Sequence, residues 1–162
     1  MKEFKPIDKL SELTEMLGAY NPIIHQKNEE GYDWLDENSF CIEVPNPNGG
    51  ESLIIEADCW EFTVFYSYYH THFCAEEGMY GAMCITISDI LNSKLGTAAI
   101  FCGSENKWMS STMIERENTS LPIEEIFQHT FNHSKSADKL RINGGEARFI
   151  FWDSSFNKTI KI

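Results

Sequence analysis

In this chain of 162 residues, the stretch FCIEVPNPNGGESLIIEA at residues 40–57 gives the strongest indication of the fold. Apolar residues alternate with small or polar ones over its first five positions, which is the pattern of a half-buried β-strand. The run of Pro, Asn and Gly at residues 45–50 indicates a turn, and residues 52–57 have the composition of a returning strand. The stretch therefore predicts a β-hairpin.

A second stretch, EFTVFYSYYHTHF at residues 61–73, is rich in the aromatic and β-branched residues that favour strands. We expect one long strand here. Because side chains two positions apart project from the same face of a strand, Tyr66, Tyr68, His70 and His72 would share one face. Their rings could then contact a single ligand or partner.

Helical patterns occupy other parts of the chain. Apolar residues recur every three or four positions over residues 7–20 and 80–91, which indicates two amphipathic helices. Ser120 followed by Leu-Pro and two glutamates is typical of a helix start, so a third helix is expected over residues 120–131. A shorter helical piece is expected at residues 137–143.

Two more hairpins complete the predicted fold. One pairs residues 97–102 with 107–115, and the other pairs 147–152 with 158–162. The polar residues 26–38 are expected to form a loop. Together these elements predict an α+β fold: a single domain over residues 1–162, with a mainly antiparallel sheet built from hairpins and about three helices packed on one face.

Charge is distributed unevenly along the chain. There are 13 Lys and Arg against 25 Asp and Glu, which gives a net charge of −12. Such an excess repels phosphates and argues against direct binding to nucleic acid or to an anionic membrane surface. No Lys or Arg occurs between Lys27 and Lys94, where 13 acidic residues lie. These acids either hydrate separate loops and faces, or form one acidic surface suited to a basic protein.

The cysteines and the N-terminus predict the compartment. The first residues contain acids and a proline where a secretory leader needs an apolar run, and no apolar run is long enough to span a bilayer. The five cysteines are an odd number without a C-x-x-C pair, which is typical of free thiols. A bridge from Cys41 to Cys59 is not expected, because the predicted hairpin places Cys41 opposite Ile54. We expect a soluble cytoplasmic protein.

Two histidines indicate a candidate metal site. His70 and His72 would project from one face of the predicted strand, and imidazoles with a carboxylate such as Glu76 or Glu77 suit a divalent transition metal such as zinc. The alternative is an aromatic surface whose rings hydrogen-bond among themselves and are partly hydrated. Both interpretations stay open at this point.

Signatures of known catalytic chemistry are absent from the sequence. Glu125, His129 and His133 are spaced as on one helix face, but the zinc-protease pattern H-E-x-x-H is missing, and a solvated helix face is favoured. Neither a nucleophile elbow nor a phosphate-binding glycine loop occurs. The sequence therefore predicts no catalytic residue, and a protein that is not an enzyme is favoured.

The aromatic stretch YYHTHF at residues 68–73, the acidic helix after it, and the turn NGGE at 143–146 leading into FIFWD at 149–153 carry a resemblance. About a fifth of the chain is similar to small uncharacterised bacterial domains, some of which resemble immunity proteins of polymorphic-toxin systems. The resemblance implies a small, acidic, non-catalytic protein that neutralises a toxin by covering its active or substrate-binding surface.

The leading hypothesis is therefore a protein-binding module for a basic partner such as a toxin domain. Acids would steer the partner, and aromatic side chains would supply lasting contacts. The residues expected to bind the partner are Trp34, Trp60, Glu61, Tyr66, Tyr68, His70, His72, Glu76 and Glu77. The alternatives are the metal site at His70, His72 and Glu76, either as a metal-binding protein or as a metal-dependent enzyme, and a small-molecule pocket lined by Tyr and His.

Overall fold

The structure is a computed structural model that describes residues 4–123, 125–126, 140 and 142–162. The chain forms two compact units. Unit 1 comprises Met1–Tyr66 and His70–Ser88, and unit 2 comprises Ser67–Tyr69 and Asp89–Ile162. Each unit is described by itself below.

Unit 1 is built on a five-stranded antiparallel sheet whose strands follow one another in space as they do in the sequence, in the order β1-β2-β3-β4-β5. These strands are β1 (Ile23–His25), β2 (Phe40–Val44), β3 (Leu53–Ala57), β4 (Glu61–Tyr66) and β5 (Tyr69–Cys74). The helices are η1 (Pro6–Lys9), α1 (Leu10–Met16), η2 (Gly18–Tyr20) and α2 (Glu77–Leu91), where η marks a 3-10 helix.

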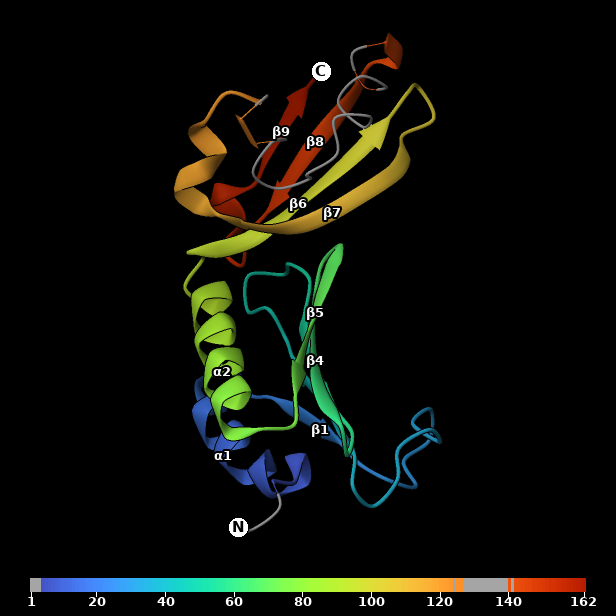
Figure 1. Cartoon of the computed structure of the whole chain (residues 1–162), viewed down its shortest axis with the longest axis vertical. Coiled ribbons are helices and arrows are strands. Elements are labelled where there is room, and N and C mark those ends of the chain that lie inside the picture. Colours follow the sequence, from blue (N-terminus) through green and yellow to red (C-terminus); the bar gives the residue numbers. More distant parts are fainter. Residues whose placement is uncertain (1–3, 124, 127–139, 141) are drawn as a thin grey trace. The chain divides into compact units, whose positions relative to one another are not determined.

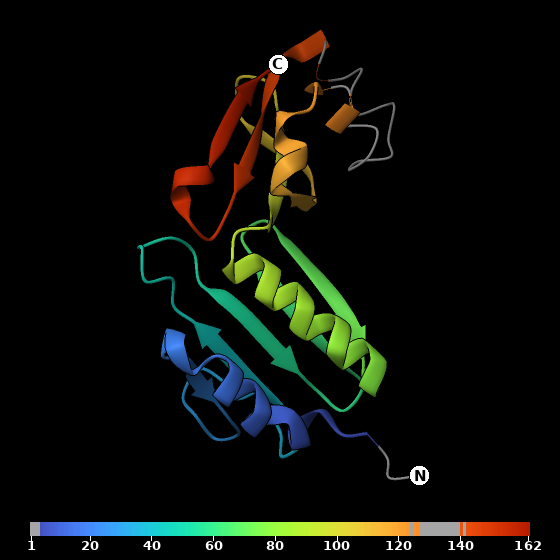
Figure 2. The ribbon, with the colours of Figure 1, turned by 90° about the vertical axis from the view of Figure 1, so that its left-hand side faces the viewer.

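Helices α1 and α2 lie on one face of this sheet (Figures 1 and 2). The period-two pattern of the strands explains why. Phe40 and Ile42 of β2, Ile55 of β3 and Phe62 of β4 are fully buried, as is Leu13 of α1. The core of unit 1 thus fills the layer between the sheet and these helices.

The predicted hairpin at residues 40–57 is confirmed, but its register differs from the expectation. Cys41 lies opposite Glu56, not Ile54. The pairing of Val44 with Leu53 centres the connection on Asn48 and Gly49, and Gly49 has a positive φ of 75° that glycine adopts without strain. The turn is therefore one residue further along the chain than predicted.

The prediction of one long strand over residues 61–73 is wrong. The stretch folds back on itself, with β4 ending at Tyr66 and β5 beginning at Tyr69. Ser67 takes a left-handed φ of 51°, which reverses the chain direction. Two residues without a turn signature in their composition were enough to form the turn, because the aromatic residues on both sides gain more by packing as neighbouring strands.

Unit 2 contains a four-stranded antiparallel sheet in the order β7-β6-β8-β9. The strands are β6 (Leu95–Cys102), β7 (Lys107–Glu115), β8 (Gly145–Ile150) and β9 (Lys158–Lys161), and the 3-10 helices are η3 (Arg116–Ser120) and η4 (Ser154–Phe156). Both predicted hairpins of this region are present. A buried cluster that includes Ile100, Ile114, Phe149 and Phe151 forms its core.

The α+β class and the antiparallel pairing are confirmed, whereas the single sheet is wrong because the strands divide into two sheets. Within the described residues the α-helices given bounds are α1 and α2. The third predicted helix, over residues 120–131, and the piece at residues 137–143 fall partly outside the described residues. The single-domain organisation stays a prediction. No helix among the described residues is long and apolar enough to cross a membrane.

Candidate functional site

The face of the five-stranded sheet opposite α1 and α2, here called the open face, gathers most of the chemistry of unit 1. Residues directly opposite each other on neighbouring strands share a face. The register therefore places His25, Cys41, Glu56 and Thr63 in one row across β1 to β4. A second row of the open face contains Ile23, Glu43, Ile54 and Phe65.

His70 and His72 of β5 extend these rows, and the structure brings them together as the sequence suggested. Their rings lie 5.1 Å apart between centroids at a right angle, and the His70 ring is 5.3 Å from that of Phe65. The side chain of His72 is hydrogen-bonded through Nδ1 to Glu61 Oε1 at 2.8 Å, with Thr63 Oγ1 3.1 Å from the same nitrogen. A carboxylate only accepts, so Nδ1 carries the proton.

The Glu61–His72 pair orients the imidazole on the sheet surface. With Nδ1 committed to the carboxylate, Nε2 is the nitrogen left to meet a partner or ligand. The side chains of His72 and Glu61 are 53% and 40% exposed, so this edge of the open face is accessible to a large partner. The arrangement can present one polar, adaptable hydrogen-bonding group beside aromatic rings.

The described residues hold no group of three or more His, Cys, Asp or Glu that could hold a metal ion. His70 and His72 are neighbours, but the carboxylate in contact with His72 is Glu61, whereas Glu76 follows the end of β5. The metal set of His70, His72 and Glu76 stays a prediction without a completed ligand shell in the described part of the chain. The helix face of Glu125, His129 and His133 lies mostly outside the described residues.

Among the described residues, Trp60 has the most exposed large aromatic side chain, at 78%. Its position follows from the turn that precedes β4. The carboxylate Oδ1 of Asp58 accepts hydrogen bonds from the backbone N–H groups of Trp60 at 2.7 Å and Glu61 at 2.9 Å. Such a turn, closed by an Asp side chain on the backbone two and three residues ahead, fixes the main chain while the indole points to solvent.

Trp34 and the loop around it also reach the surface. In this loop Leu35 is buried, while its neighbour Trp34 is 55% exposed. Tyr32 is partly buried, and its ring stacks on that of His25, with ring centroids 3.8 Å apart and planes 10° from parallel. The loop is thereby attached to the β1 edge of the open face.

His25 is a functional candidate that sequence reasoning missed. It is 7% exposed, its Nδ1 lies 2.6 Å from Glu29 Oε1, and its buried Nε2 has no hydrogen-bond partner among the described residues. Beside it, burial raises the pKa of Cys41 to about 12, with nearby glutamates adding to the effect. Burial also raises the pKa of Glu56 and of Tyr32. No local motif signals this cluster, because β1 has only three residues.

Neither of the two predicted partner-binding tyrosines belongs to this surface. Tyr66 is 1% exposed, so the expectation that it contributes to a binding surface is wrong, and burial raises its pKa. It points into the core because β4 continues its alternation up to the turn. Tyr68 is grouped with unit 2, where its ring packs edge-on against Phe101 at 5.4 Å.

Glu76 and Glu77 are both exposed, and both lie near lysines of the N-terminal segment. Glu77 Oε1 pairs with Lys9 Nζ at 3.2 Å, and the same ammonium pairs with Glu12 at 3.2 Å. Glu76 and Glu77 also line a pocket of about 430 Å³ with Lys5 and Lys9. Part of the negative charge at this end of unit 1 is thus already balanced within the chain.

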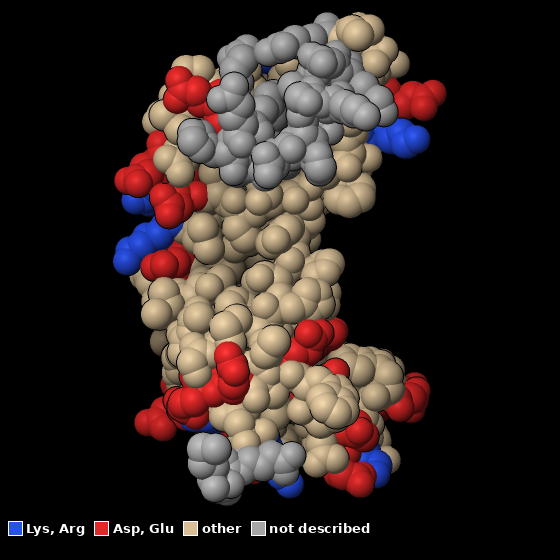
Figure 3. All heavy atoms as spheres, viewed as in Figure 1, with Lys and Arg blue, Asp and Glu red and all other residues tan. Residues whose placement is uncertain are grey.

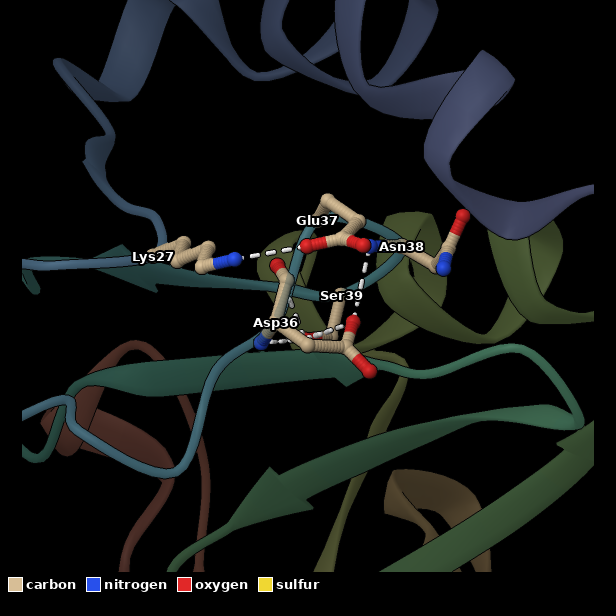
Figure 4. A network of polar contacts seen from close by, with 5 residues as sticks. All are labelled: Lys27, Asp36, Glu37, Asn38 and Ser39. Atoms are coloured by element: carbon tan, nitrogen blue, oxygen red, sulfur yellow. Dashed lines mark hydrogen bonds and ion pairs between the residues drawn. The ribbon is translucent and has the colours of Figure 1, made fainter.

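Some of the acids have a structural role, as the network in Figure 4 illustrates. Asp36 accepts hydrogen bonds from the Asn38 backbone at 2.7 Å and from the Ser39 hydroxyl at 3.0 Å, which lowers its pKa. Lys27 binds Glu37 at 2.6 Å and lowers the pKa of that carboxyl. Asp36 and Glu37 therefore have partners within this loop and help to hold its conformation.

The charge of the whole chain nevertheless belongs to one unit. Unit 1 contains 16 Asp and Glu against 4 Lys, and unit 2 contains 9 acidic and 9 basic residues. The net charges are −12 and 0. Figure 3 shows acidic side chains spread over the visible face of unit 1 among few basic ones.

Unit 2 offers a different kind of feature. A pocket of about 500 Å³ is lined by Asp89, Lys94, Leu95, Glu115, Arg116, Glu117 and Ser120. Its described lining contains neither Tyr nor His, so it is not the Tyr- and His-lined pocket considered from the sequence. Its lining includes both acidic and basic residues, and the Arg116 guanidinium lies over the Phe156 ring at 4.3 Å.

Comparison of the chain with protein-family models, curated proteins and solved structures finds no match. The similarity to immunity proteins therefore stays a prediction.

Proposed function

We propose that this chain is a non-catalytic, immunity-like binding module that uses the acidic unit 1 to hold and neutralise a basic protein. The observation that carries the proposal is the division of charge: the entire net charge of −12 lies in unit 1. Solubility depends on the net charge of the protein and does not require that charge to be concentrated in one unit. A concentrated negative field attracts a cationic partner and accelerates its association.

Exposed aromatic residues of the same unit would supply the contacts that last. Trp60 and Trp34 offer large apolar surfaces, and aromatic side chains of this kind dominate the binding energy of many interfaces. His72, oriented by Glu61, and the neighbouring His70 add polar contacts on the open face. The proposed surface comprises Trp34, Trp60, Glu61, His70, His72, Glu76 and Glu77.

Affinity capture from the source cells with matched charge variants tests the proposal. Glu76→Lys with Glu77→Lys reverses two charges in unit 1, and Glu105→Lys with Glu117→Lys reverses two exposed charges in unit 2. Both variants change the net charge equally. We expect the wild type and the unit 2 variant to capture a basic protein. The purified partner should then associate about tenfold more slowly with the unit 1 variant than with the wild type. Equal effects of the two variants would contradict the proposal.

A further inference from the structure

The two sheets have four edge strands, and three of them carry features that discourage pairing with another chain. Strand β1 has only three residues. Strand β7 begins with Lys107 and has a register irregularity against β6, and β9 carries Lys158 and Lys161. Short length, bulges and lysines are the usual ways in which an exposed edge is protected.

Strand β5 has none of these features. Its sequence YHTHFC contains no Lys and no Pro, and it is six residues long. The sheet order places β4 on one side of β5 and no strand of the described residues on the other side. A long, regular edge of this kind is a template for a further strand.

The hydrogen-bonding direction along β5 follows from a contact at its end. The Ala75 N–H donates to the Trp60 carbonyl at 2.8 Å, so Ala75 faces β4. Along an antiparallel strand, the N–H and C=O groups of successive residues point alternately toward one neighbouring strand and toward the other. His72 is three residues before Ala75, so its N–H and C=O point away from β4. The Cys74 N–H points the same way.

We propose that β5 is a docking edge, along which the basic partner protein adds an extended segment as a sixth strand of the sheet. This inference rests on the proposed function and specifies how the partner binds. The added strand would pair with the backbone of His72 and Cys74 and would direct alternate side chains toward the open face, where Glu61 lies.

Charge favours a basic segment over a second copy of this chain. No Lys or Arg occurs between residues 28 and 93, so an added lysine-bearing strand meets acidic side chains and no basic ones from that part of the chain. Two copies paired through β5 would instead bring together two units of net charge −12. Like charges placed side by side cost binding energy.

The test uses a blocked octapeptide of alternating Lys and Val as the probe, with the full chain. His72→Pro removes the outward N–H without touching the β4 ladder, because proline is accepted on an edge where its nitrogen faces solvent. His72→Ala keeps the N–H and removes only the imidazole. His72→Ala therefore measures the contribution of the side chain alone. We expect His72→Pro to bind the peptide about tenfold more weakly than His72→Ala does, from the loss of the backbone hydrogen bond.

Amide hydrogen exchange of the wild-type chain gives a second measurement that needs no variant. The peptide should slow exchange at His72 and Cys74. Unchanged exchange at both amides, or equal peptide affinity of folded His72→Pro and His72→Ala, would overturn the docking edge while leaving acid-dependent binding intact. A chain that is dimeric alone and becomes monomeric in His72→Pro would also overturn it, because the occupant would then be a second copy. Peptide affinity that is lost in His72→Pro but indifferent to salt would support the edge and contradict the proposed function instead.

Discussion

Replacing Asp58 by alanine tests how the chain presents its most exposed aromatic residue. Oδ1 of Asp58 accepts from two backbone N–H groups, those of Trp60 and Glu61, and the Asp58 N–H donates to the Glu61 carbonyl at 3.1 Å. Asp58→Ala removes the two side-chain bonds but leaves the backbone bond. Asp58→Asn is the matched control, because its amide oxygen can still accept both.

The expected magnitude follows from the similarity of this turn to a helix N-cap. A side-chain oxygen that satisfies backbone N–H groups at a helix start contributes about 1 kcal/mol, and the exposed site here lets water replace part of the loss. A local opening equilibrium shifted by about 1 kcal/mol changes by about fivefold. The Trp60 and Glu61 amides should therefore exchange about fivefold faster in Asp58→Ala.

Amide hydrogen exchange followed by NMR measures this directly at the two residues. Asp58→Asn should stay within about twofold of the wild type if its amide oxygen replaces the carboxylate as acceptor. Exchange in Asp58→Ala that matches the wild type, or an equal acceleration in Asp58→Asn, would refute the idea that the Asp58 side chain holds this turn.

Three further outcomes follow from the structure. Gly81→Ala, at an open position inside α2, should raise the free energy of unfolding by about 0.5–1 kcal/mol. Gly96→Ala should lower the free energy of unfolding, because a Cβ at residue 96 would lie 2.5 Å from a backbone oxygen of β8. Urea unfolding of the two variants measures both changes. Burial raises the pKa of Glu56, so the folded state favours the protonated carboxyl. The stability that this gives at pH values below the ordinary pKa of glutamate is lost as the pH rises through the raised pKa. A free energy of unfolding that falls equally with pH in Glu56→Gln and in the wild type would contradict this reasoning. If His70 and His72 bind zinc, untagged protein should contain it stoichiometrically and lose it on double alanine substitution, as elemental analysis would reveal.

The parts of the fold predicted from sequence are those with strong local patterns. The alternation and the Pro-Asn-Gly turn of residues 40–57 predicted β2 and β3, and the three- and four-residue spacing over residues 80–91 predicted α2. The turn at Ser67 could not be predicted in this way, because the flanking residues favour a strand on both sides and only tertiary packing decides where the chain reverses. The division into two sheets is likewise a tertiary property.

The candidate site shows the same limit. The neighbourhood of His70 and His72 was predicted because residues two apart on a strand share a face. Their partner Glu61 was selected from the sequence only as an acid, and its contact with His72 depends on the unexpected hairpin. His25 joins the same face through a three-residue strand that leaves no periodic signal.

The most direct test of the central claim is amide hydrogen exchange of the chain with and without its captured basic partner. If unit 1 is the binding surface, exchange should slow in β4, β5 and the turn at Trp60, and the effect should weaken as salt is raised. Slowed exchange confined to β6–β9 of unit 2, or protection of unit 1 that does not change with salt, would contradict the account.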